Sequence, residues 1–408
     1  MWLYNLGISL YAGGIRLAAL WHGKARLWSE GRRNIFERME AAVRPSDRIV
    51  WVHAASLGEF EQARPIIERL RAEHPEYKIL LTFFSPSGYE IRKNYEGADY
   101  VFYLPADTPS NARRFLDIVH PEIAIFIKYE FWINLLSELR RRKVRSYIVS
   151  AIFRRNSVFF RPYGAMWRQA LETFDTLFVQ NVESKRLLSE IGFDNVVVAG
   201  DTRFDRVAQI AAAAQRVETI ERFRGGGRLF VAGSTWGPDE EILLPLVNAN
   251  PDVKFVIAPH EMDEGRIAHL MRDAKGGAVR YTQCDAATRF DDVQVLVLDT
   301  MGMLSSVYGS ATWAYVGGGF GVGIHNTLEA ATFGLPIAFG PNYGKFKEAR
   351  DMVSLGCAVS VRTAGELAAW FAPLRDDEET LRRASRTAKD YTARNQGATG
   401  IILRSIFN

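Results

Sequence analysis

The stretch that decides the fold runs from Ile49 to Leu70 and reads IVWVHAASLGEFEQARPIIERL. It opens with a short apolar, β-branched run, which is typical of a buried strand. Apolar residues at helical spacing follow from Phe60, and the pattern stops before Pro75. A short turn containing Gly58 joins the two. Because a strand leads through a tight turn into a helix, the stretch predicts one unit of an open α/β sheet.

Glu59 lies where the carboxyl end of this strand meets the amino end of the helix. Open α/β sheets bind their ligands at this edge. A carboxylate in the first turn of a helix is also favoured by the helix dipole without any further role. The position therefore admits two interpretations, a helix-stabilising carboxylate and a catalytic base.

The alternation of strand and helix repeats along the chain. The strands predicted in the first half are residues 49–53, 79–84, 100–104, 123–131, 145–153, 176–181 and 196–200. A second series begins after residue 227 and reads RLFVAGST, KFVIAPH, VQVLVLDT, TWAYVGGG, PIAFGP and CAVSV. Strands that alternate with amphipathic helices predict parallel sheets with helices on both faces. The predicted fold class is α/β, with two Rossmann-like domains that we expect to face a central cleft.

The domain boundaries follow from breaks in this pattern. Residues 1–30 are expected to form a separate N-terminal segment that associates with membranes, and residues 31–215 the first α/β domain. The three glycines 225–227 mark a linker. Residues 228–390 are expected to form the second domain, and residues 391–408 a helix that packs back toward the first.

Composition argues against several classes of protein. Hydrophobic residues make up 48% and charged residues 24% of the 408 positions, which is typical of a globular chain. The net charge of +4 comes from scattered basic residues, so nucleic acid is not expected as a partner, whereas anionic small molecules or lipid head groups fit. Cys284 and Cys357 are the only cysteines, and no cysteine–histidine cluster exists. We therefore expect no metal site and a reducing compartment.

The N-terminus is mostly apolar for about twenty residues, which is unusual for the start of a globular domain. Arg16 interrupts the run near its centre, and a charge there opposes a helix that spans the bilayer. Aromatic residues accompany the run and basic residues follow it: Trp2, Tyr4, Tyr11, Trp21, Lys24, Arg26, Arg32 and Arg33. This pattern predicts a helix that lies in a membrane interface. The alternative is a core helix of the first domain.

The second half holds a glycine-rich stretch, YVGGGFGVGIHNTLEAATFGLPIAFGP, from Tyr315 to Pro341. Glycines let a backbone approach a ligand closely, and the helix expected to begin near His325 or Asn326 would attract phosphate with its N–H groups. Glu329, one turn after Asn326, would accept hydrogen bonds from ribose hydroxyls. The alternative is tight packing of a helix on a strand.

Further loops close other predicted strands. In the second half they contain Ser234 with Thr235, His260, and residues 300–303; together with the glycine-rich loop they predict one pocket at adjacent strand ends. In the first half, Glu130 follows a very apolar strand and Arg203 follows the last strand. Each has a structural alternative, as a helix-end carboxylate and as a surface ion pair.

These blocks, in this order, resemble the 3-deoxy-D-manno-octulosonic acid (Kdo) transferases of lipopolysaccharide synthesis. The resemblance runs over nearly the whole chain and rests on HAASLGEFEQARPIIERL, YEFWINLL, SKRLLSEIGF, GDTRFD, AGSTW, MGML, VGGGF, HNTLEAATFGLPIAFGP and NYGKFKEA. It implies the glycosyltransferase B fold and inverting transfer of Kdo from CMP-Kdo to an anionic, tetraacylated lipid A precursor. It also implies no metal cofactor and a place on the cytoplasmic face of the inner membrane, at its lipid surface.

The resemblance also implies roles for individual residues. Glu59 resembles the general base of the family, and Glu130 and Arg203 resemble groups that stabilise the transition state. The residues that resemble the CMP-binding segments are Ser234, Pro259, His260, Met301, Gly302, Met303, Asn326, Thr327, Leu328 and Glu329.

Three positions depart from the family pattern. Met303 stands where an acidic residue is common, and Pro259 where an arginine is common. The segment 150–155, SAIFRR, replaces an Asn-Ala-Arg segment, and Arg154 or Arg155 could take over its role. Two other enzymes stay open, a UDP-sugar transferase acting on a lipid and a sugar-nucleotide 2-epimerase. A binding protein without activity is a further alternative.

Overall fold

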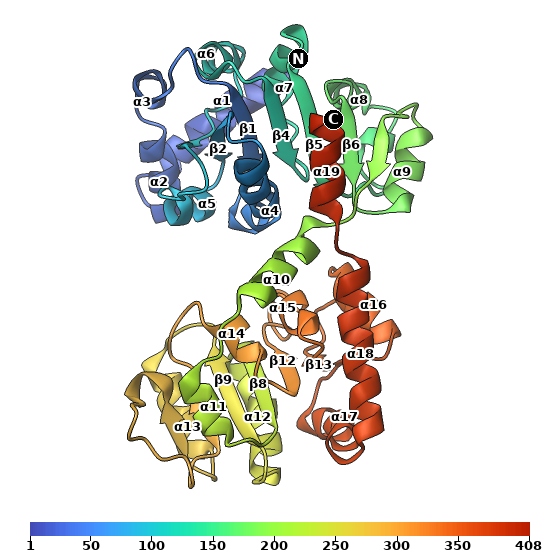
Figure 1. Cartoon of the computed structure of the whole chain (residues 1–408). Helices are drawn as coiled ribbons and strands as arrows, with labels where there is room; N and C mark the ends of the chain where they lie inside the picture. Colours follow the sequence, from blue (N-terminus) through green and yellow to red (C-terminus); the bar gives the residue numbers. More distant parts are fainter. The chain divides into compact units, whose positions relative to one another are not determined.

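A computed structural model describes residues 1–408. The chain forms two compact units (Figure 1). Unit 1 contains residues 1–206 and 396–408, and unit 2 contains residues 207–395. Each unit has its own seven-stranded sheet and its own buried apolar clusters. All strand pairs are parallel. The α/β class with two Rossmann-like domains is confirmed.

The sheet of unit 1 has the order β3-β2-β1-β4-β5-β6-β7. Its strands are β1 (Ile49–Ala54), β2 (Lys78–Phe83), β3 (Tyr100–Tyr103), β4 (Ile123–Ile127), β5 (Arg145–Ala151), β6 (Thr176–Val179) and β7 (Val196–Val198). The strand order reverses between β1 and β4, which pair directly. Ligands of open α/β sheets bind outside the carboxyl ends of the strands at such a switch point. The loops after β1 and β4 are therefore the first place to look for a site.

Strand β1 explains why this sheet forms. All six of its residues are buried, and successive side chains enter opposite cores. Val50 and Val52 join the cluster under helix α4 (Leu57–Glu73), whereas Trp51 joins the cluster on the other face. The Trp51 indole donates to Thr82 Oγ1 at 2.8 Å. Each buried apolar side chain contributes about 1.5–3 kcal/mol, so this strand anchors both layers.

The remaining helices of unit 1 cover both faces of its sheet. They are α5 (Pro86–Arg92), α6 (Pro109–Val119), α7 (Ile133–Arg141), α8 (Ala165–Leu171), α9 (Val182–Ser189) and α19 (Ala398–Phe407), with a 3-10 turn at Val158–Phe160. Helix α10 (Thr202–Ala213) contains the boundary between the units. Strand β4 ends four residues earlier than predicted, because Lys128 takes a left-handed backbone conformation with φ of 61°.

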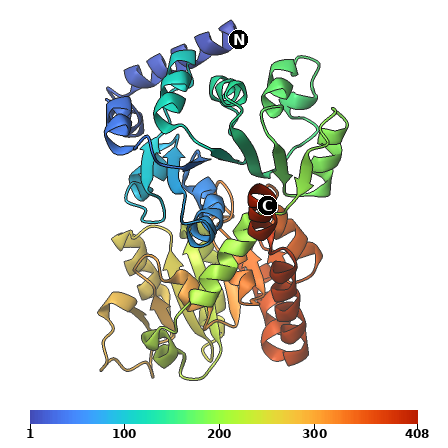
Figure 2. The same ribbon diagram turned by 45° about the horizontal axis from the view of Figure 1, so that its top comes forward.

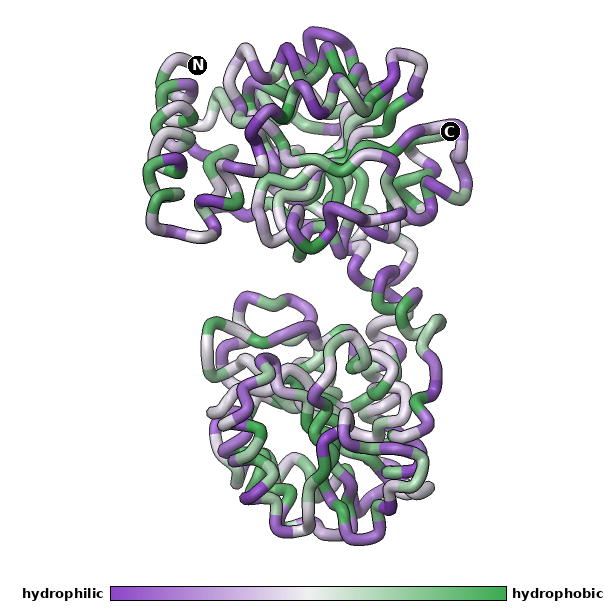
Figure 3. The backbone as a smooth tube through the Cα atoms, turned by 90° about the vertical axis from the view of Figure 1, so that its left-hand side faces the viewer, coloured by the Kyte–Doolittle hydropathy of each residue, from purple (hydrophilic) through white to green (hydrophobic).

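Three helices precede the first strand: α1 (Trp2–Ala18), α2 (Gly23–Gly31) and α3 (Ile35–Ala42). Two polar side chains of helix α1 bond to the body of unit 1. The Tyr4 hydroxyl donates to Asp107 at 2.6 Å, and Asn134 Nδ2 donates to Asn5 Oδ1 at 2.9 Å. No residue of α1 is buried, so it is not a core helix. Figure 3 shows it at the edge of its unit, with hydrophobic residues along its length.

The outward face of α1 is apolar. Its exposed side chains include Trp2, Leu3, Leu6, Leu10, Leu17, Leu20 and Trp21 at the end of the segment. In the whole chain, no helix combines the length and the apolar character that crossing a bilayer requires.

The sheet of unit 2 has the order β10-β11-β9-β8-β12-β13-β14. Its strands are β8 (Leu229–Thr235), β9 (Lys254–Pro259), β10 (Ala278–Arg280), β11 (Val295–Val297), β12 (Trp313–Val316), β13 (Ile337–Phe339) and β14 (Ala358–Ser360). Strand β10 was not predicted, since its three residues carry no clear apolar run. The order reverses between β8 and β12, so the loops after these two strands mark the switch point of unit 2.

The helices of unit 2 are α11 (Glu218–Arg224), α12 (Gly237–Ala249), α13 (Glu264–Asp273), α14 (Leu304–Tyr308), α15 (Leu328–Thr332), α16 (Lys347–Ser354), α17 (Ala364–Asp376) and α18 (Glu378–Arg394), with a 3-10 turn at Tyr281–Gln283. Gly225 ends α11 in a left-handed conformation, and the glycines 225–227, predicted to form the linker, lie inside unit 2.

Helix α19 returns to unit 1 (Figure 2). Ile402, Leu403 and Ile406 join the apolar cluster that β1 and α4 build. The carboxylate of Asp205 accepts hydrogen bonds from the backbone N–H groups of Gly397 and Thr399, at 2.6 and 2.7 Å. These contacts fix the start of α19 and satisfy N–H groups that a helix terminus otherwise leaves free.

Candidate functional site

The switch point of unit 1 holds a buried histidine bonded to a carboxylate. His53 is the fifth residue of β1, and Glu130 follows β4. His53 Nε2 lies 3.1 Å from Glu130 Oε2, and its Nδ1 lies 2.9 Å from Thr82 Oγ1. The Trp132 indole donates to the same Glu130 oxygen at 2.7 Å. Glu130 is thereby held in one place with only 12% of its side chain exposed.

Glu59 has a different environment at the same sheet edge. It lies in the first turn of α4, three residues after the N-cap residue Ser56. In a capping box, the serine hydroxyl would accept from the helix backbone and the glutamate would reach back to the serine N–H. Here the Ser56 hydroxyl donates to Glu59 Oε2 at 2.6 Å, and no side chain caps the helix. The Glu59 carboxylate is therefore not used to close the helix end.

Arg203 is oriented by a buried carboxylate. It lies at the start of α10, and its Nε and Nη2 donate to Asp201 Oδ2 at 2.9 and 2.8 Å. Asp201 is only 6% exposed. Its other oxygen accepts from Gln62 Nε2 of α4 at 3.0 Å. Gln62 lies one helical turn after Glu59 on α4. Helix α4 therefore carries Glu59 itself and also positions Arg203, through the hydrogen bond from Gln62 to Asp201.

Tyr129 shows that four loops meet at this edge. Burial raises the pKa of Tyr129, and the charges of Arg154, Asp201 and Glu59 act on it as well. Tyr129 follows β4, Arg154 follows β5, Asp201 follows β7 and Glu59 follows β1. The geometry thus brings Glu59, Glu130 and Arg203 to one sheet edge of unit 1, and Arg154 lies close enough to influence Tyr129.

An aromatic chain connects this edge to the N-terminal helices. The ring of Trp132 lies 4.6 Å from that of Phe84, which stacks on Tyr11 of α1 at 6.1 Å and meets Trp28 of α2 at 5.9 Å. Edge-to-face and stacked rings at these distances attract each other beyond their buried area. Trp132, which helps to fix Glu130, is therefore connected through Phe84 to the helices α1 and α2.

In unit 2, the end of β8 holds the first of the predicted donor-binding residues. Ser234 has φ of 54°, and the register between β8 and β9 shifts there. A serine in this left-handed conformation is strained, and such residues concentrate at functional sites. Thr235 donates to Glu240 Oε1 at 2.8 Å, and Arg266 donates to the same oxygen at 2.8 Å.

Two histidines and a tryptophan stack at the edge of the same sheet. The rings of His260 and His325 lie 4.3 Å apart, and that of Trp236 lies 4.9 Å from His260. The Trp236 indole donates to His325 Nε2 at 3.2 Å. Burial, with the nearby charge of His260, lowers the pKa of His325. His325 is therefore kept neutral, so that it can accept this hydrogen bond. Pro259 ends β9 as a buried residue, whereas His260 is exposed.

The glycine-rich loop serves close packing between strand ends. A Cβ atom on Gly317 would lie 2.2 Å from the Ser234 carbonyl oxygen, and one on Gly319 would lie 2.6 Å from Gly340 Cα. At both positions the close neighbour is backbone at the end of another strand, and not a helix as the packing alternative has it. The buried carboxylate of Asp239 ties the loop down by accepting from the Gly318 N–H at 2.9 Å. Burial raises the pKa of Asp239.

Glu329 is bonded within unit 2. It accepts from Ser305 Oγ at 2.8 Å and from Asn326 Nδ2 at 3.0 Å. Helix α15 begins at Leu328, later than predicted, and has only five residues. Asn326 Oδ1 already accepts from the Leu328 N–H at 3.1 Å. The start of α15 therefore has fewer free N–H groups for a phosphate, and a weaker helix dipole, than a long, uncapped helix would have.

The other predicted donor residues differ in accessibility. Met301 is 82% exposed and Gly302 is exposed with φ of 85°, whereas Met303 is half-buried and packs against the core. Leu328 is fully buried, and the Thr327 hydroxyl is buried without a hydrogen-bond partner. The chain contains no group of three or more His, Cys, Asp or Glu side chains that could hold a metal ion.

Several residues of these edges were missed from the sequence. They are His53, Gln62, Asp201, Trp236 and Asp239. His53 could have been found, because a polar residue in an otherwise apolar strand needs a buried partner. The partnership of Gln62 with Asp201 could not, because the two residues are 139 positions apart.

The known proteins similar to this chain in sequence include Kdo transferases. A family model described as 3-deoxy-D-manno-octulosonic-acid transferase (kdotransferase) matches residues 32–206. A 3-deoxy-D-manno-octulosonic acid transferase of Haemophilus influenzae is 25% identical over 378 residues, covering 88% of this chain and 86% of that protein. The enzyme of that name from Bordetella pertussis is 28% identical over 366 residues, covering 86% and 85%.

Among solved structures, UDP-GlcNAc 2-epimerase from Neisseria meningitidis bound to UDP-GlcNAc matches with a TM-score of 0.61. At 16% identity, over 88% of this chain and 99% of that one, the match shows the fold alone. The family model, in contrast, covers Glu59, Glu130 and Arg203, and the sequence relatives extend across both units. This chain is therefore similar to 3-deoxy-D-manno-octulosonic acid transferases over most of its length, and the family model matches the part of unit 1 that contains the candidate site.

Proposed function

We propose that this enzyme transfers Kdo from CMP-Kdo to a hydroxyl of an anionic, tetraacylated lipid A precursor by an inverting mechanism. The observation that carries the proposal is the contrast between two carboxylates at one sheet edge. Glu130 is fixed by His53 and Trp132, whereas Glu59 accepts one short hydrogen bond from Ser56 and is not used to cap its helix.

Glu59 has the properties that a general base requires. It is half-buried, so it is accessible to a substrate hydroxyl, and it lies at the ligand-binding edge of the sheet. In the proposed reaction its carboxylate takes the proton of the acceptor hydroxyl, the hydroxyl oxygen forms a bond to the anomeric carbon of Kdo, and the bond from that carbon to the CMP phosphate breaks. The electron pair of the broken bond leaves with CMP.

In the proposed reaction Arg203 acts through its charge, and Glu130 acts by positioning the acceptor. Arg203 carries a fixed positive charge, since Asp201 holds its guanidinium by two hydrogen bonds. Such a charge stabilises a phosphate that becomes more negative as it leaves. Glu130 is held rigidly by His53 and can orient the acceptor sugar through hydrogen bonds.

The donor-side proposal rests on unit 2. The predicted CMP-binding residues gather at the ends of β8, β9, β11 and β12, which are neighbours in the sheet. The rings of Trp236, His260 and His325 lie together, with His260 exposed, and the backbone around Gly302 is open. These features suit a nucleotide, whose base stacks on aromatic rings.

We further propose that the enzyme works at the cytoplasmic surface of the inner membrane. The outward apolar face of α1 supports this proposal, because large exposed apolar surfaces mark contacts with partners or lipid. The helix would lie in the interface plane.

The test is transfer from freshly prepared CMP-Kdo to the tetraacylated precursor, followed by mass spectrometry of the lipid. We expect a mass increase of one or more Kdo units that persists in EDTA. UDP-sugars serve as alternative donors in parallel reactions. No Kdo-bearing lipid from the wild-type enzyme, or transfer from a UDP-sugar instead, would contradict the proposal.

A further inference from the structure

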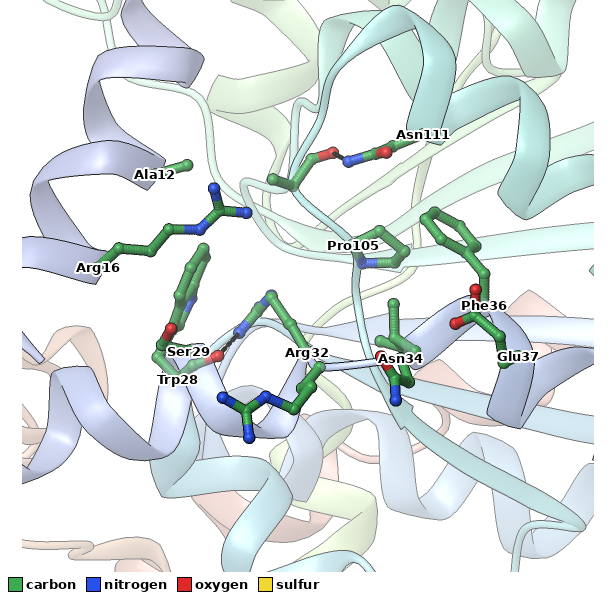
Figure 4. Close-up of a pocket in the computed structure, with 13 residues that line it drawn as sticks. Ala12, Arg16, Trp28, Ser29, Arg32, Asn34, Phe36, Glu37, Pro105 and Asn111 are labelled. Atoms are coloured by element: carbon green, nitrogen blue, oxygen red, sulfur yellow. Dashed lines mark hydrogen bonds between the residues drawn. The ribbon is translucent and has the colours of Figure 1, made fainter.

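Unit 1 contains a pocket of about 440 Å³ whose lining includes neither Glu59 nor Glu130. It lies between α1, α2, the start of α3 and the segment that leads into α6, and its lining includes Arg16, Arg33, Asn34 and Pro105. Figure 4 shows the Arg16 side chain reaching from α1 into this space. We call it the arginine pocket.

One arginine of the pocket is structural. Arg32 donates to the carbonyl oxygens of Leu104 and Phe84 at 2.8 Å each and to that of Trp28 at 3.1 Å. Its guanidinium also stacks on the Trp28 ring, at 3.9 Å from the ring centre. Burial lowers the pKa of Arg32 to about 9. Arg32 therefore ties α2 to the sheet and has few donors left for a ligand.

The other two arginines are uncompensated. Arg16 and Arg33 line the pocket, are exposed, and make no side-chain hydrogen bond or ion pair in the structure. The one carboxylate of the lining, Glu37, is bonded to Arg114 at 3.2 Å. The pocket thus carries two positive charges that no side chain of the chain neutralises.

Backbone geometry adds hydrogen-bond donors to this charge. Asn34, the N-cap residue of α3, has a left-handed backbone with φ of 51°, and its side chain makes no capping hydrogen bond. The Glu37 carboxylate accepts from its own backbone N–H, so the uncapped N–H groups at the start of α3 are those of Ile35 and Phe36. Guanidinium groups and free helix N–H groups are the donors that bind phosphate in proteins.

The surroundings identify the source of such a phosphate. Leu17, Leu20 and Trp21, which adjoin Arg16 in the sequence, are 59%, 65% and 75% exposed. An apolar helix face beside a positively charged pocket matches the two layers of a membrane surface, acyl chains and anionic head groups. We propose that the arginine pocket binds the phosphate of an anionic bilayer phospholipid through Arg16 and Arg33. This inference rests on the proposed membrane location.

Binding there would orient more than a helix. Tyr4 and Asn5 dock α1 on the body of unit 1 through Asp107 and Asn134, so a lipid held beside α1 is held at a fixed place on the whole unit. The pocket would therefore set how the sheet edge with Glu59 is presented to the bilayer surface.

The experiment measures binding of the full chain to vesicles, without donor or acceptor. We compare vesicles of phosphatidylcholine alone with vesicles that also contain phosphatidylglycerol. For the variant R16A/R33A we expect about 10- to 30-fold weaker binding to the anionic vesicles, on the scale of two basic residues at a membrane surface. The control R383A/R386A removes the same charge from two exposed residues of α18 in unit 2, and should bind as the wild type does.

The variant R16K/R33K separates a defined site from general attraction. It keeps both charges but loses the planar, bidentate geometry of arginine, so a built phosphate site predicts clearly weaker binding to the anionic vesicles. Equal binding by R16K/R33K and the wild type, or equal losses in R16A/R33A and R383A/R386A, would overturn the proposal.

A second measurement distinguishes the bilayer from the substrate. In micelles of nonionic detergent that contain no phospholipid, R16A/R33A should have the acceptor KM of the wild type. A raised acceptor KM would assign the pocket to a phosphate of the acceptor and overturn the bilayer assignment. Vesicle binding needs no catalysis, so failure of the proposed function would appear separately, as absence of product from the wild type.

Discussion

Replacing Asp201 by Asn should reduce turnover while leaving the fold intact. Asp201 accepts two hydrogen bonds from the Arg203 guanidinium, at 2.9 and 2.8 Å, and one from Gln62 at 3.0 Å. An asparagine can still accept from Gln62 through its oxygen. Its amide group then faces the guanidinium, so the two charge-assisted hydrogen bonds are lost and two donors oppose each other.

The size of the effect follows from these bonds. A hydrogen bond to a charged group contributes about 1.5–3 kcal/mol, so the pair is worth about 3–6 kcal/mol when both partners are buried. Arg203 is 29% exposed, and water will replace part of that loss. We expect about 2–3 kcal/mol to remain as lost orientation of Arg203, which corresponds to a 30- to 150-fold lower turnover at about 1.4 kcal/mol per tenfold.

The assay is single-turnover transfer from saturating CMP-Kdo, together with CMP affinity and the melting temperature. The matched control is E61Q, which removes a carboxylate from the same helix. Glu61 pairs with Arg92 and Arg206 at 3.3 Å each. Wild-type turnover in a folded D201N variant, or an equal loss in E61Q, would refute the argument that Asp201 positions Arg203.

Three further predictions concern the two sheet edges. For E59Q we expect turnover to fall by about 10²–10⁴-fold with CMP affinity unchanged, because the amide can still accept from Ser56 but cannot take a proton. A single-turnover rate within tenfold of the wild-type rate would rule out a base at this position. For G317A we expect a melting temperature lower by about 2–10 °C and weaker CMP binding, because the added Cβ would lie 2.2 Å from a backbone oxygen. The control G237A adds a Cβ in open space and should have the melting temperature of the wild type. In the folded protein the pKa of His325 lies below its ordinary 6.5, so the stability that the neutral ring contributes is present above pH 6.5 and is lost as the pH falls through the lowered pKa. The melting temperature of H325Q should therefore drop less than that of the wild type between about pH 7.5 and pH 5.5. An equal drop in both proteins would contradict this assignment.

The course of the backbone could be predicted where apolar runs are long and both faces of a strand are buried. Strand β1 and helix α4 appeared in the sequence with nearly their observed limits, because a continuous buried strand and an amphipathic helix each have a clear period. Strand β10 did not, since its three residues, Ala278–Arg280, carry no clear apolar run. The end of β4 was misplaced because the apolar pattern continues past Lys128, where the left-handed backbone turns the chain.

The candidate sites were predictable to a different degree. The position of Glu59 follows from local sequence, since a strand, a turn and a helix are enough to place it at a sheet edge. What surrounds it depends on residues from distant parts of the chain. The bond between His53 and Glu130 spans 77 positions, and no local pattern reports it. The hydrogen bond from Ser305 to Glu329 similarly arises only once α14 and α15 are side by side.

The return of α19 to unit 1 has a consequence for biosynthesis. Ile402, Leu403 and Ile406 complete an apolar cluster that otherwise consists of residues from the first half of the chain. On the ribosome, unit 1 emerges first and must wait for this helix while unit 2 is made, which takes roughly 10–40 s at typical elongation rates. During that interval the surface that α19 later covers is open to water and to other chains. A ribosome that stalls inside unit 2 would therefore release a first unit with an uncovered apolar surface, a natural target for chaperones and proteases.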